Sequence, residues 1–481
     1  MSSEINIRGL AVETLTELDR GRRNASEAMH AVLRNYQYLS KQERSFYTRL
    51  CEGTIEYRLQ LDYLINQVSR TPVEKCRPYI RNLLRMSLYQ IRYMGRIPPE
   101  AACNEAVKLA KKKGFQHLSS FVNGVLRNLI RQQAVLSLPQ KKEDPCSYYS
   151  VTYSMPEWLV ERLLCWYPED IVEGMLCTFL TEAPLTVRVN QIQGTREAVK
   201  KALEQEGIQA EDGYYTENTL RLSGINYMNR IRPFRQGLIT VQDESSVLQG
   251  CLLKPQADSQ ILDVCAAPGG KSLYAAEQLY LAGCAAASAG GSSQSSGLKK
   301  LVPGLVMARD ISEKKVEQII ENAERMKIPN LRTEVWNALQ SDPDCEDQAD
   351  IVIADLPCSG LGVLGRKADI KYRLDSGQIK ELVCLQREIL TTVIPYIRYG
   401  GRLLYSTCTV NPEENEEQVW WMREQFGLEP VNIGDLLPAS LVQELSDQPG
   451  TDLEGGYATL LPGRQYCDGF FLAALYKPSE G

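Results

Sequence analysis

The sequence predicts a multidomain protein with an all-α N-terminal bundle, a small α+β subdomain and an α/β domain. Apolar residues recur at helical spacing over residues 5–135. Residues 185–234 then alternate short strand and helix patterns. In the last part, several apolar segments end in a polar or reactive residue, as parallel strands do beside a ligand crevice. These segments are 259–264, 305–310, 350–355 and 402–408.

The chain of 481 residues is long enough for three parts that each have a core. A stretch rich in proline, lysine and serine at residues 136–150 reads as a linker after the bundle. Residues 237–246, Gly-Leu-Ile-Thr-Val-Gln-Asp-Glu-Ser-Ser, open the α/β part. We therefore expect domains at 1–140, 141–235 and 236–481.

Composition excludes several classes of protein. No run of about 18 uncharged apolar residues occurs, and the N-terminus lacks the basic and apolar regions of a signal peptide. We therefore expect a cytoplasmic protein without membrane contact. The 14 cysteines include no Cys-x-x-Cys pair, and the only histidines are His30 and His117, so we expect no metal site and no disulfide framework.

The charge is distributed unevenly along the chain. Residues 1–140 carry 22 Lys and Arg against 12 Asp and Glu, a net charge of +10, whereas the remainder is at −16. A basic module joined to an acidic one indicates a polyanionic ligand. A solvated helical surface would give the same excess, so charge alone leaves both interpretations open.

The α/β part centres on residues 261–272, Ile-Leu-Asp-Val-Cys-Ala-Ala-Pro-Gly-Gly-Lys-Ser. A buried strand here runs into a turn of small residues and then into a helix. Bare backbone N–H groups and the helix dipole can approach a polar ligand at such a turn. The Walker A motif is excluded because Cys265 stands where it needs glycine, and the dinucleotide fingerprint is absent.

A low-complexity stretch follows this helix. Residues 283–297, Gly-Cys-Ala-Ala-Ala-Ser-Ala-Gly-Gly-Ser-Ser-Gln-Ser-Ser-Gly, predict a flexible insertion before the second strand. It touches no motif residue, although it could shield the entrance of a ligand site.

Three motifs together resemble those of a known family. They are residues 263–271 (Asp-Val-Cys-Ala-Ala-Pro-Gly-Gly-Lys), 355–360 (Asp-Leu-Pro-Cys-Ser-Gly) and 405–415 (Tyr-Ser-Thr-Cys-Thr-Val-Asn-Pro-Glu-Glu-Asn). In this order they resemble the signatures of the Sun/RsmB family of RNA (cytosine-carbon-5) methyltransferases. Residues 121–128 resemble the last helix of the NusB-like RNA-binding domain that precedes the catalytic part in this family. The resemblance implies a Rossmann-like α/β domain that binds S-adenosylmethionine (SAM).

The resemblance also places the cofactor. Asp310 ends the second strand, where a carboxylate can accept from both hydroxyls of a ribose. Asn337 stands where the family more often has an aspartate facing the adenine, and an amide can still bond to an adenine edge. Asp355 is assigned to the same pocket. The cofactor turn itself comprises Cys265, Ala266, Ala267, Pro268, Gly269, Gly270 and Lys271.

The chemistry predicts a nucleophilic cysteine. Carbon 5 of cytosine attacks a methyl group only after a nucleophile has added to carbon 6, and a thiolate suits that addition. The resemblance assigns the attack to Cys408 and breakdown of the adduct to Cys358, whereas in DNA cytosine methyltransferases the Pro-Cys residue attacks. Asp355 can hydrogen-bond to the cytosine edge and stabilise charge there. Water, a carboxylate or Cys358 could remove the carbon-5 proton.

Basic and polar residues near these motifs predict RNA contacts. Arg188 and Asn190 occupy same-face positions of a strand in the small subdomain, where the family has an RNA-recognition-like fold. Arg366, Lys367 and Lys371 follow the glycine-containing loop after Cys358 and could grip phosphates. The cytosine must reach a pocket, so the RNA is expected to be single-stranded or to have the base flipped out.

The resemblance implies 16S ribosomal RNA, naked or in a small-subunit assembly intermediate, as substrate and partner of a monomer. Two alternatives remain at this point. The same chemistry could act on transfer RNA or another RNA, or the chain could be a non-catalytic RNA-binding or assembly factor. The residues themselves name neither the modified cytosine nor the role of the insertion.

Overall fold

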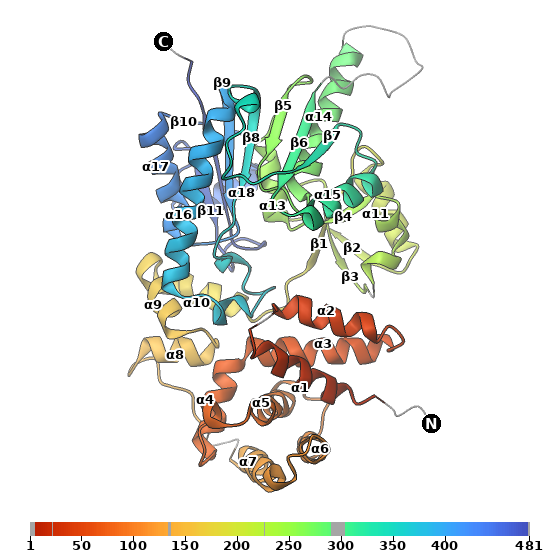
Figure 1. The fold of residues 1–481 in the computed structure, drawn as a ribbon, viewed down its shortest axis with the longest axis vertical. Helices are drawn as coiled ribbons and strands as arrows, with labels where there is room; N and C mark the ends of the chain where they lie inside the picture. Colours follow the sequence, from red (N-terminus) through yellow and green to blue (C-terminus); the bar gives the residue numbers. More distant parts are fainter. Residues whose placement is uncertain (1–4, 22, 133–135, 226, 290–303, 480–481) are drawn as a thin grey trace. The chain divides into compact units, whose positions relative to one another are not determined.

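The computed structural model describes residues 5–21, 23–132, 136–225, 227–289 and 304–479 (Figure 1). These residues form two compact units. The helical unit comprises residues 1–181 and the segment Leu364–Arg373, and the α/β unit comprises residues 182–363 and 374–481. Among the described residues, no helix is both long and apolar enough to span a membrane.

The helical unit is a bundle, as its apolar spacing predicts. Its core contains leucines and tyrosines such as Leu50, Leu83 and Tyr47, all with no exposed surface. Polar residues begin several helices; Ser40 and Glu43, for example, form a capping box before α3. The helices are α1 (Ile7–Leu18), α2 (Ala25–Asn35), α3 (Lys41–Glu56), α4 (Arg58–Val68), α5 (Pro78–Tyr93), α6 (Pro99–Lys112), α7 (Ser119–Arg131), α8 (Pro145–Thr152), α9 (Glu157–Trp166) and α10 (Glu169–Thr178).

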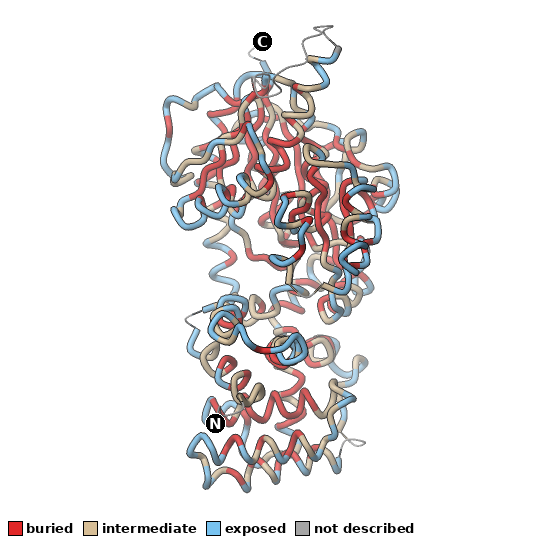
Figure 2. Tube along the Cα trace, turned by 90° about the vertical axis from the view of Figure 1, so that its right-hand side faces the viewer, coloured by how far each residue is buried: buried red, intermediate tan, exposed pale blue. Residues whose placement is uncertain are grey.

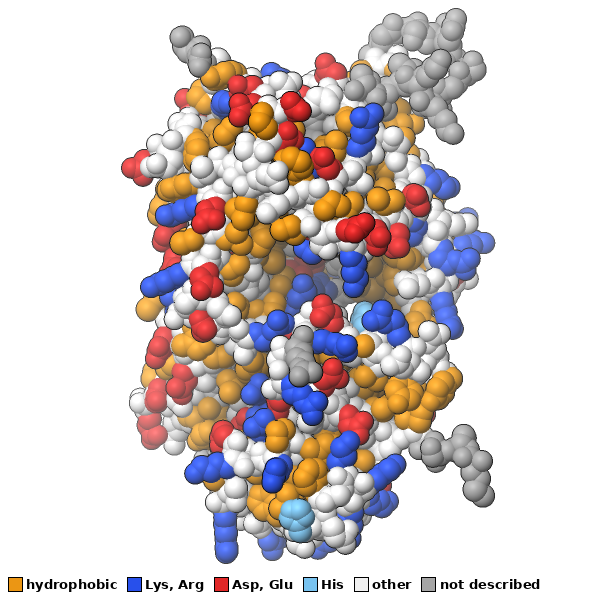
Figure 3. Space-filling view, viewed as in Figure 1, with side chains coloured by type: hydrophobic (Ala, Val, Ile, Leu, Met, Phe, Trp, Pro, Cys, Tyr) orange, Lys and Arg blue, Asp and Glu red, His pale blue; other side chains and the backbone are white. Residues whose placement is uncertain are grey.

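The basic excess of the first 140 residues belongs to this unit. On the face shown in Figure 3, Lys and Arg side chains are spread over the helical unit. This is the surface that the net charge of +10 in residues 1–140 produces.

The α/β unit begins with a small antiparallel sheet in the order β2-β3-β1-β4. One face of this sheet packs on the amphipathic helix α11, with Val187, Val199 and Leu203 in their common core. The elements are β1 (Leu185–Val189), α11 (Arg196–Glu204), β2 (Gln209–Asp212), β3 (Thr219–Ser223), α12 (Arg232–Arg235) and β4 (Ile239–Val241). This is the predicted small α+β subdomain.

The larger sheet has the order β10-β12-β9-β8-β5-β6-β7, with β11 paired to β12. Strands β5 to β9 are parallel, and β12 runs antiparallel to β9. The elements are α13 (Glu244–Cys251), β5 (Gln260–Asp263), α14 (Gly270–Ala289), β6 (Leu305–Asp310), α15 (Glu313–Met326), β7 (Leu331–Val335), β8 (Ala349–Asp355), α16 (Ser376–Val393), β9 (Ile397–Thr407), α17 (Glu416–Phe426), β10 (Glu429–Pro430), α18 (Ala439–Leu445), β11 (Tyr457–Leu460) and β12 (Phe470–Tyr476). The predicted strands of the Rossmann-like domain are confirmed.

Helices cover both faces of the larger sheet. Ile261 and Ile353 face α13, α14 and α18 on one side. Their neighbours Leu262 and Val352 face α16 and α17 on the other side. Figure 2 shows these strands as the most continuously buried part of the unit. Burial on both faces explains why the strands read as continuous apolar runs and why their polar ends stand out.

One expectation about the chain's organisation changes. The stretch 283–297 is not flexible throughout, because residues 283–289 continue α14; alanine, which dominates them, has the highest helix propensity. Residues 290–297 lie outside the described residues. The predicted domains at 1–140, 141–235 and 236–481 stay a prediction beside the two compact units given above. Helices α8–α10 group with the bundle, and the small sheet groups with the larger one.

Candidate active site at the strand ends of the α/β unit

The two predicted cysteines lie at the ends of neighbouring parallel strands. The register of β8 and β9 pairs Asp355 with Ser406. Cys358 and Cys408 follow these strand ends, and their Sγ atoms lie 3.3 Å apart. Two thiols from separate motifs, 50 residues apart in sequence, therefore share one site.

Lys271 connects the cofactor turn to this site. Its Nζ donates to Oδ2 of Asp355 at 2.5 Å, and the Oγ of Ser406 donates to the other carboxylate oxygen at 2.7 Å. The Asp355 side chain remains 31% exposed. The carboxylate is thus held in a fixed orientation while one part of it stays accessible to a ligand.

Glu414 joins the loops that carry the cysteines. Its buried carboxylate accepts from the backbone N–H of Ser359 at 2.8 Å and from the Oγ of Ser359 at 2.5 Å. It also accepts from Nδ2 of Asn411 at 2.9 Å. Ser359 directly follows Cys358, and Asn411 lies on the loop after β9, so one carboxylate fixes both loops. Burial raises the pKa of Glu414.

The pKa of the Cys358 thiol is shifted by its surroundings. It is raised well above its usual value, first by the hydrogen bond shared with Cys408 and then by burial. Cys358 is therefore a neutral thiol at physiological pH.

The cofactor turn presents backbone rather than side chains. Gly269 has a φ of 103°, which favours glycine, and the turn leads into the N-terminus of α14. Burial raises the pKa of Cys265 to about 12, so its thiol stays neutral. Asp263, buried at the end of β5, accepts from Oγ of Ser272 at 2.5 Å, and burial raises its pKa to about 7.

The second and third parallel strand ends complete the expected pocket. Asp310 ends β6, and its Oδ2 accepts from the backbone N–H of Ala267 at 3.2 Å, which ties it to the turn. Asn337 follows β7, and its Oδ1 accepts from the N–H of Leu339 at 3.1 Å. The donor Nδ2 of Asn337 has no partner among the described residues. A carboxylate beside bare backbone, with a nearby amide donor, fits the ribose and adenine of a nucleoside cofactor.

The predicted RNA contacts of Arg188 and Asn190 are wrong, because both side chains are fully buried. The guanidinium of Arg188 pairs with Glu277 of α14 and lies 4.3 Å from the ring centre of Tyr274. Nδ2 of Asn190 donates to the backbone oxygens of Gly237 and Met326 at 2.9 and 2.8 Å. Both residues hold the small sheet to the rest of the unit.

Lys371 is also buried rather than exposed to phosphates, which corrects its predicted role. It belongs to the helical unit, and its Nζ donates to the backbone oxygen of Glu56 at 3.0 Å. Burial lowers the pKa of Lys371 to about 7. Arg366 and Lys367, by contrast, are exposed.

Sequence reasoning missed the residues that position the site. Glu414 was visible only as part of the Asn-Pro-Glu-Glu-Asn segment, and Ser406 only as a residue before Thr-Cys. Their partners, Ser359 and Asp355, are about 50 residues away in sequence, as the bonds show. A buried carboxylate in a polar motif is not distinguishable by composition from a solvated one.

Known proteins match this chain over nearly its whole length. The model of the family 16S rRNA methyltransferase RsmB/F matches residues 250–476, that of the NusB family matches 5–131, and that of the RsmF/B-like ferredoxin-like domain matches 155–227. A curated relative from Pectobacterium carotovorum, ribosomal RNA small subunit methyltransferase B, is 33% identical over 488 residues. The match covers 99% of this chain and 100% of the relative.

Solved structures share the fold. PH0851 superposes with a TM-score of 0.75 at 22% identity, covering 99% of this chain and 100% of its own. NSun6 from Pyrococcus horikoshii, solved with SFG, a SAM analogue, superposes with a TM-score of 0.55 at 20% identity. That match covers 68% of this chain and 99% of NSun6.

Proposed function

The chain belongs to the 16S rRNA methyltransferase RsmB/F family, and we propose that it methylates carbon 5 of a cytosine in 16S ribosomal RNA through a covalent adduct with Cys408. The observation that carries this proposal is the pair of thiols from β8 and β9, 3.3 Å apart and beside the Asp355 carboxylate. A cytosine needs a nucleophile, a charge stabiliser and a proton acceptor, and these three groups supply them.

SAM is the cofactor of this methyltransferase, and when bound it supplies the methyl group. The turn from Cys265 to Lys271 would hold it by backbone N–H groups, together with the carboxylate of Asp310 and the amide of Asn337. Asp355 borders the same turn through its bond to Lys271. The proposed cofactor residues and the proposed cytosine residues follow the ends of parallel strands, which supports a common site at one edge of the sheet.

In the proposed reaction, the thiolate of Cys408 attacks carbon 6 of the cytosine. The position of Cys408 in the Ser-Thr-Cys-Thr segment supports this choice, and the raised pKa keeps the Cys358 thiol protonated. Attack makes carbon 5 electron-rich, and carbon 5 then takes the methyl group. Asp355, oriented by Lys271 and Ser406, hydrogen-bonds to the cytosine edge and stabilises the charge that develops on the ring.

Release of the product requires removal of the carbon-5 proton and cleavage of the bond between carbon 6 and sulfur. We assign the first task to Cys358, which passes its own thiol proton to solvent water and then takes the carbon-5 proton as a thiolate; the raised pKa makes this thiolate a stronger base. The electrons of the carbon–hydrogen bond re-form the ring double bond, and Cys408 leaves as a thiolate. The exposed Arg366 and Lys367 are proposed to contact RNA phosphates.

The test is a methylation assay with the purified protein. We propose that this protein is a monomer and that it acts in the cytoplasm. Wild type and Cys408→Ala are incubated with SAM and unmodified 16S RNA, naked or in small-subunit particles, and 5-methylcytosine is mapped by mass spectrometry. We expect one methylated cytosine with wild type and none with the variant. Methylation of transfer RNA instead would reassign the substrate. Absence of methylation from every RNA, with RNA binding retained, would favour a binding or assembly factor.

A further inference from the structure

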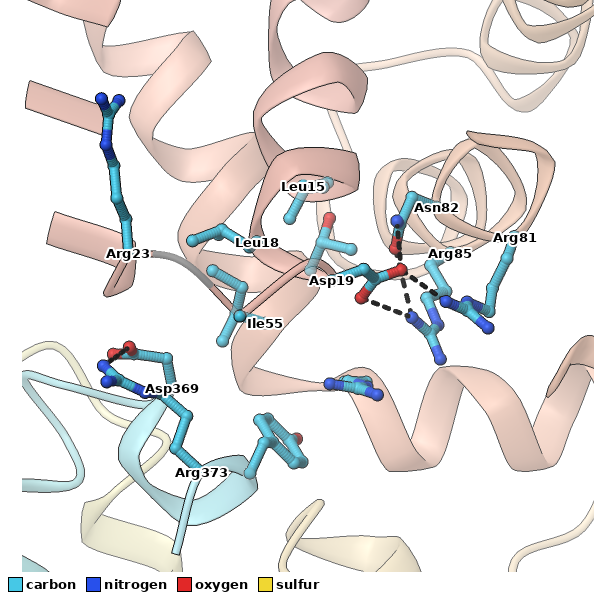
Figure 4. Close-up of a pocket in the computed structure, with 14 residues that line it drawn as sticks. Leu15, Leu18, Asp19, Arg23, Ile55, Arg81, Asn82, Arg85, Asp369 and Arg373 are labelled. Carbon is cyan, nitrogen blue, oxygen red and sulfur yellow. Dashed lines mark hydrogen bonds and ion pairs between the residues drawn. The ribbon is translucent and has the colours of Figure 1, made fainter. Parts of the chain in front are cut away.

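The helical unit contains a cavity of about 290 Å³ that lies outside the site described above (Figure 4). All residues that line it belong to the helical unit, including three from the segment Leu364–Arg373. Its charged lining residues are Arg23, Arg58, Arg81, Arg85, Arg373, Asp19 and Asp369. The cavity therefore combines residues of the basic bundle with residues that follow the Cys358 loop in the chain.

The acidic charges of the cavity are already engaged. Asp19 accepts from Arg81 at 2.6 Å and from Asn82 at 2.8 Å, and it also faces Arg85 at 4.0 Å. Asp369 accepts from the backbone N–H of Ala25 at 3.1 Å, at the start of α2, and pairs with its own neighbour in the segment, Arg373. Figure 4 shows both clusters at the edges of the cavity.

Most of the arginines are paired as well. Arg85 holds Asp62 through two hydrogen bonds of 2.6 Å, and Arg23 pairs with Glu17 at 3.4 Å. Arg58 differs, because in the described part of the chain it has neither an ion-pair partner nor a hydrogen-bond partner. Arg81 also leaves its buried Nε without a partner.

The surroundings of Arg58 favour an incoming anion. Its guanidinium lies 4.9 Å from the ring centre of Tyr372, which fixes its orientation. Burial and the positive charge of Arg85 lower the pKa of Arg58. An anion between these two guanidinium groups would relieve their repulsion and would satisfy donors that now have no acceptor.

The side chains that line the cavity restrict which part of a nucleotide it can bind. Arg58 covers the ring of Tyr372, the only aromatic side chain in the lining, so no free ring remains on which a base could stack. The planar fork of a guanidinium matches a phosphate group in two-point fashion. The cavity thus suits a phosphate without its base.

From these observations we propose that the cavity binds a backbone phosphate of the RNA substrate, with Arg58 as the principal contact. The inference rests on the proposed function for the identity of the RNA. It gives the basic bundle a specific contact with an RNA phosphate. It also gives a reason why the segment Leu364–Arg373 packs with the helical unit. Tyr372 and Asp369 of that segment orient Arg58 and the start of α2.

The test compares full-length Arg58→Gln, Arg58→Lys and the control Arg70→Gln with wild type. Arg70 is exposed, belongs to the same unit and does not line the cavity. Affinity for unmodified 16S RNA is measured across a salt series. We expect Arg58→Gln to bind about three- to tenfold more weakly and to lower the salt slope by about 0.7–0.9, the loss of one phosphate contact. Arg58→Lys should restore the slope, and Arg70→Gln should match wild type.

Equal losses in Arg58→Gln and Arg70→Gln, or wild-type affinity in Arg58→Gln, would overturn the proposal. A thermal melt in millimolar inorganic phosphate separates the two sources of the anion. If phosphate stabilises wild type but not Arg58→Gln while both bind RNA equally, the occupant is free phosphate and the RNA assignment is wrong. If Arg58→Gln does not fold, Arg373→Gln tests the same cavity from an exposed position.

Methylation by wild type is followed in the same samples. Binding that depends on Arg58 without methylation would support the cavity and reject the proposed activity. If wild type methylates the RNA but RNA binding does not depend on Arg58, the result would support the proposed activity and reject the phosphate site in the cavity.

Discussion

At the scale of single residues, Glu414 links the two motifs that carry the chemistry. Its carboxylate receives donors from both cysteine loops, and Gln386 of α16 adds a further bond at 3.1 Å. A fully satisfied buried network of this kind fixes geometry more than it adds stability. The 3.3 Å separation of the cysteine Sγ atoms therefore depends on Glu414, which holds both loops.

Replacing Glu414 with glutamine should disturb both loops. One carboxylate oxygen becomes an amide NH2, which cannot accept from the donors it now faces, so at least one buried donor is left unpaired. We expect about 1–3 kcal/mol lower free energy of unfolding and a lower kcat with little change in KM for SAM. Urea unfolding and the methylation assay measure these effects. The exposed Glu417→Gln, in the next turn, is the control and should behave as wild type; equal activity in both variants would contradict the positioning role.

Residue identity alone did not reveal which polar side chains are buried. Arg188 alternates with Val187 and Val189, a pattern typical of a strand with one wet face. Its face is instead covered by α14, which supplies Glu277 from 89 residues away. Long-range pairing of this kind leaves no local signal, so the predicted RNA contact was wrong while the predicted strand was confirmed.

At the scale of elements, strand ends were the most informative part of the sequence. Each apolar segment that ends in a polar residue became a parallel strand, and these ends meet at the site because neighbouring parallel strands end at the same edge. The continuation of α14 over residues 283–289 was missed, because glycine and serine in the same stretch indicated a linker. Of the predicted phosphate contacts Arg366, Lys367 and Lys371, the structure corrects Lys371, which is buried within the helical unit as part of the segment Leu364–Arg373.

This segment should give the protein a characteristic pH dependence. The pKa of Lys371 is about 7 in the folded state against an ordinary 10.5, so the unfolded chain binds the extra proton between these values. Above about pH 10.5 Lys371 is uncharged in both the folded and the unfolded chain, so its burial costs no charge-related free energy. This free-energy cost grows as the pH falls to about 7 and is constant below that value. Stability conferred by this residue therefore rises with pH across that window.

The check is a comparison of melting temperatures for wild type, Lys371→Met and the exposed control Lys367→Met from pH 6 to 10. Lys371→Met should gain stability relative to wild type at the acid end, and the difference should shrink as the pH rises. A difference that is independent of pH would show that Lys371 is not held uncharged by burial.

At the scale of the whole molecule, the charge asymmetry and the fold agree. The basic excess belongs to the helical unit, and the acidic remainder surrounds a sheet whose strand ends carry the cysteines. Composition could indicate a polyanionic ligand, but only the motifs predicted the chemistry. Buried polar residues such as Arg188 and Asn190 join the small sheet to the rest of the α/β unit.

The central claim is the division of labour between Cys408 and Cys358. The most direct measurement is a denaturing gel of wild type, Cys408→Ala and Cys358→Ala after incubation with SAM and unmodified 16S RNA. If Cys408 attacks and Cys358 releases, only Cys358→Ala should accumulate protein-linked RNA, while Cys408→Ala should neither link nor methylate. Accumulation of the adduct in Cys408→Ala would contradict the account and reverse the two roles.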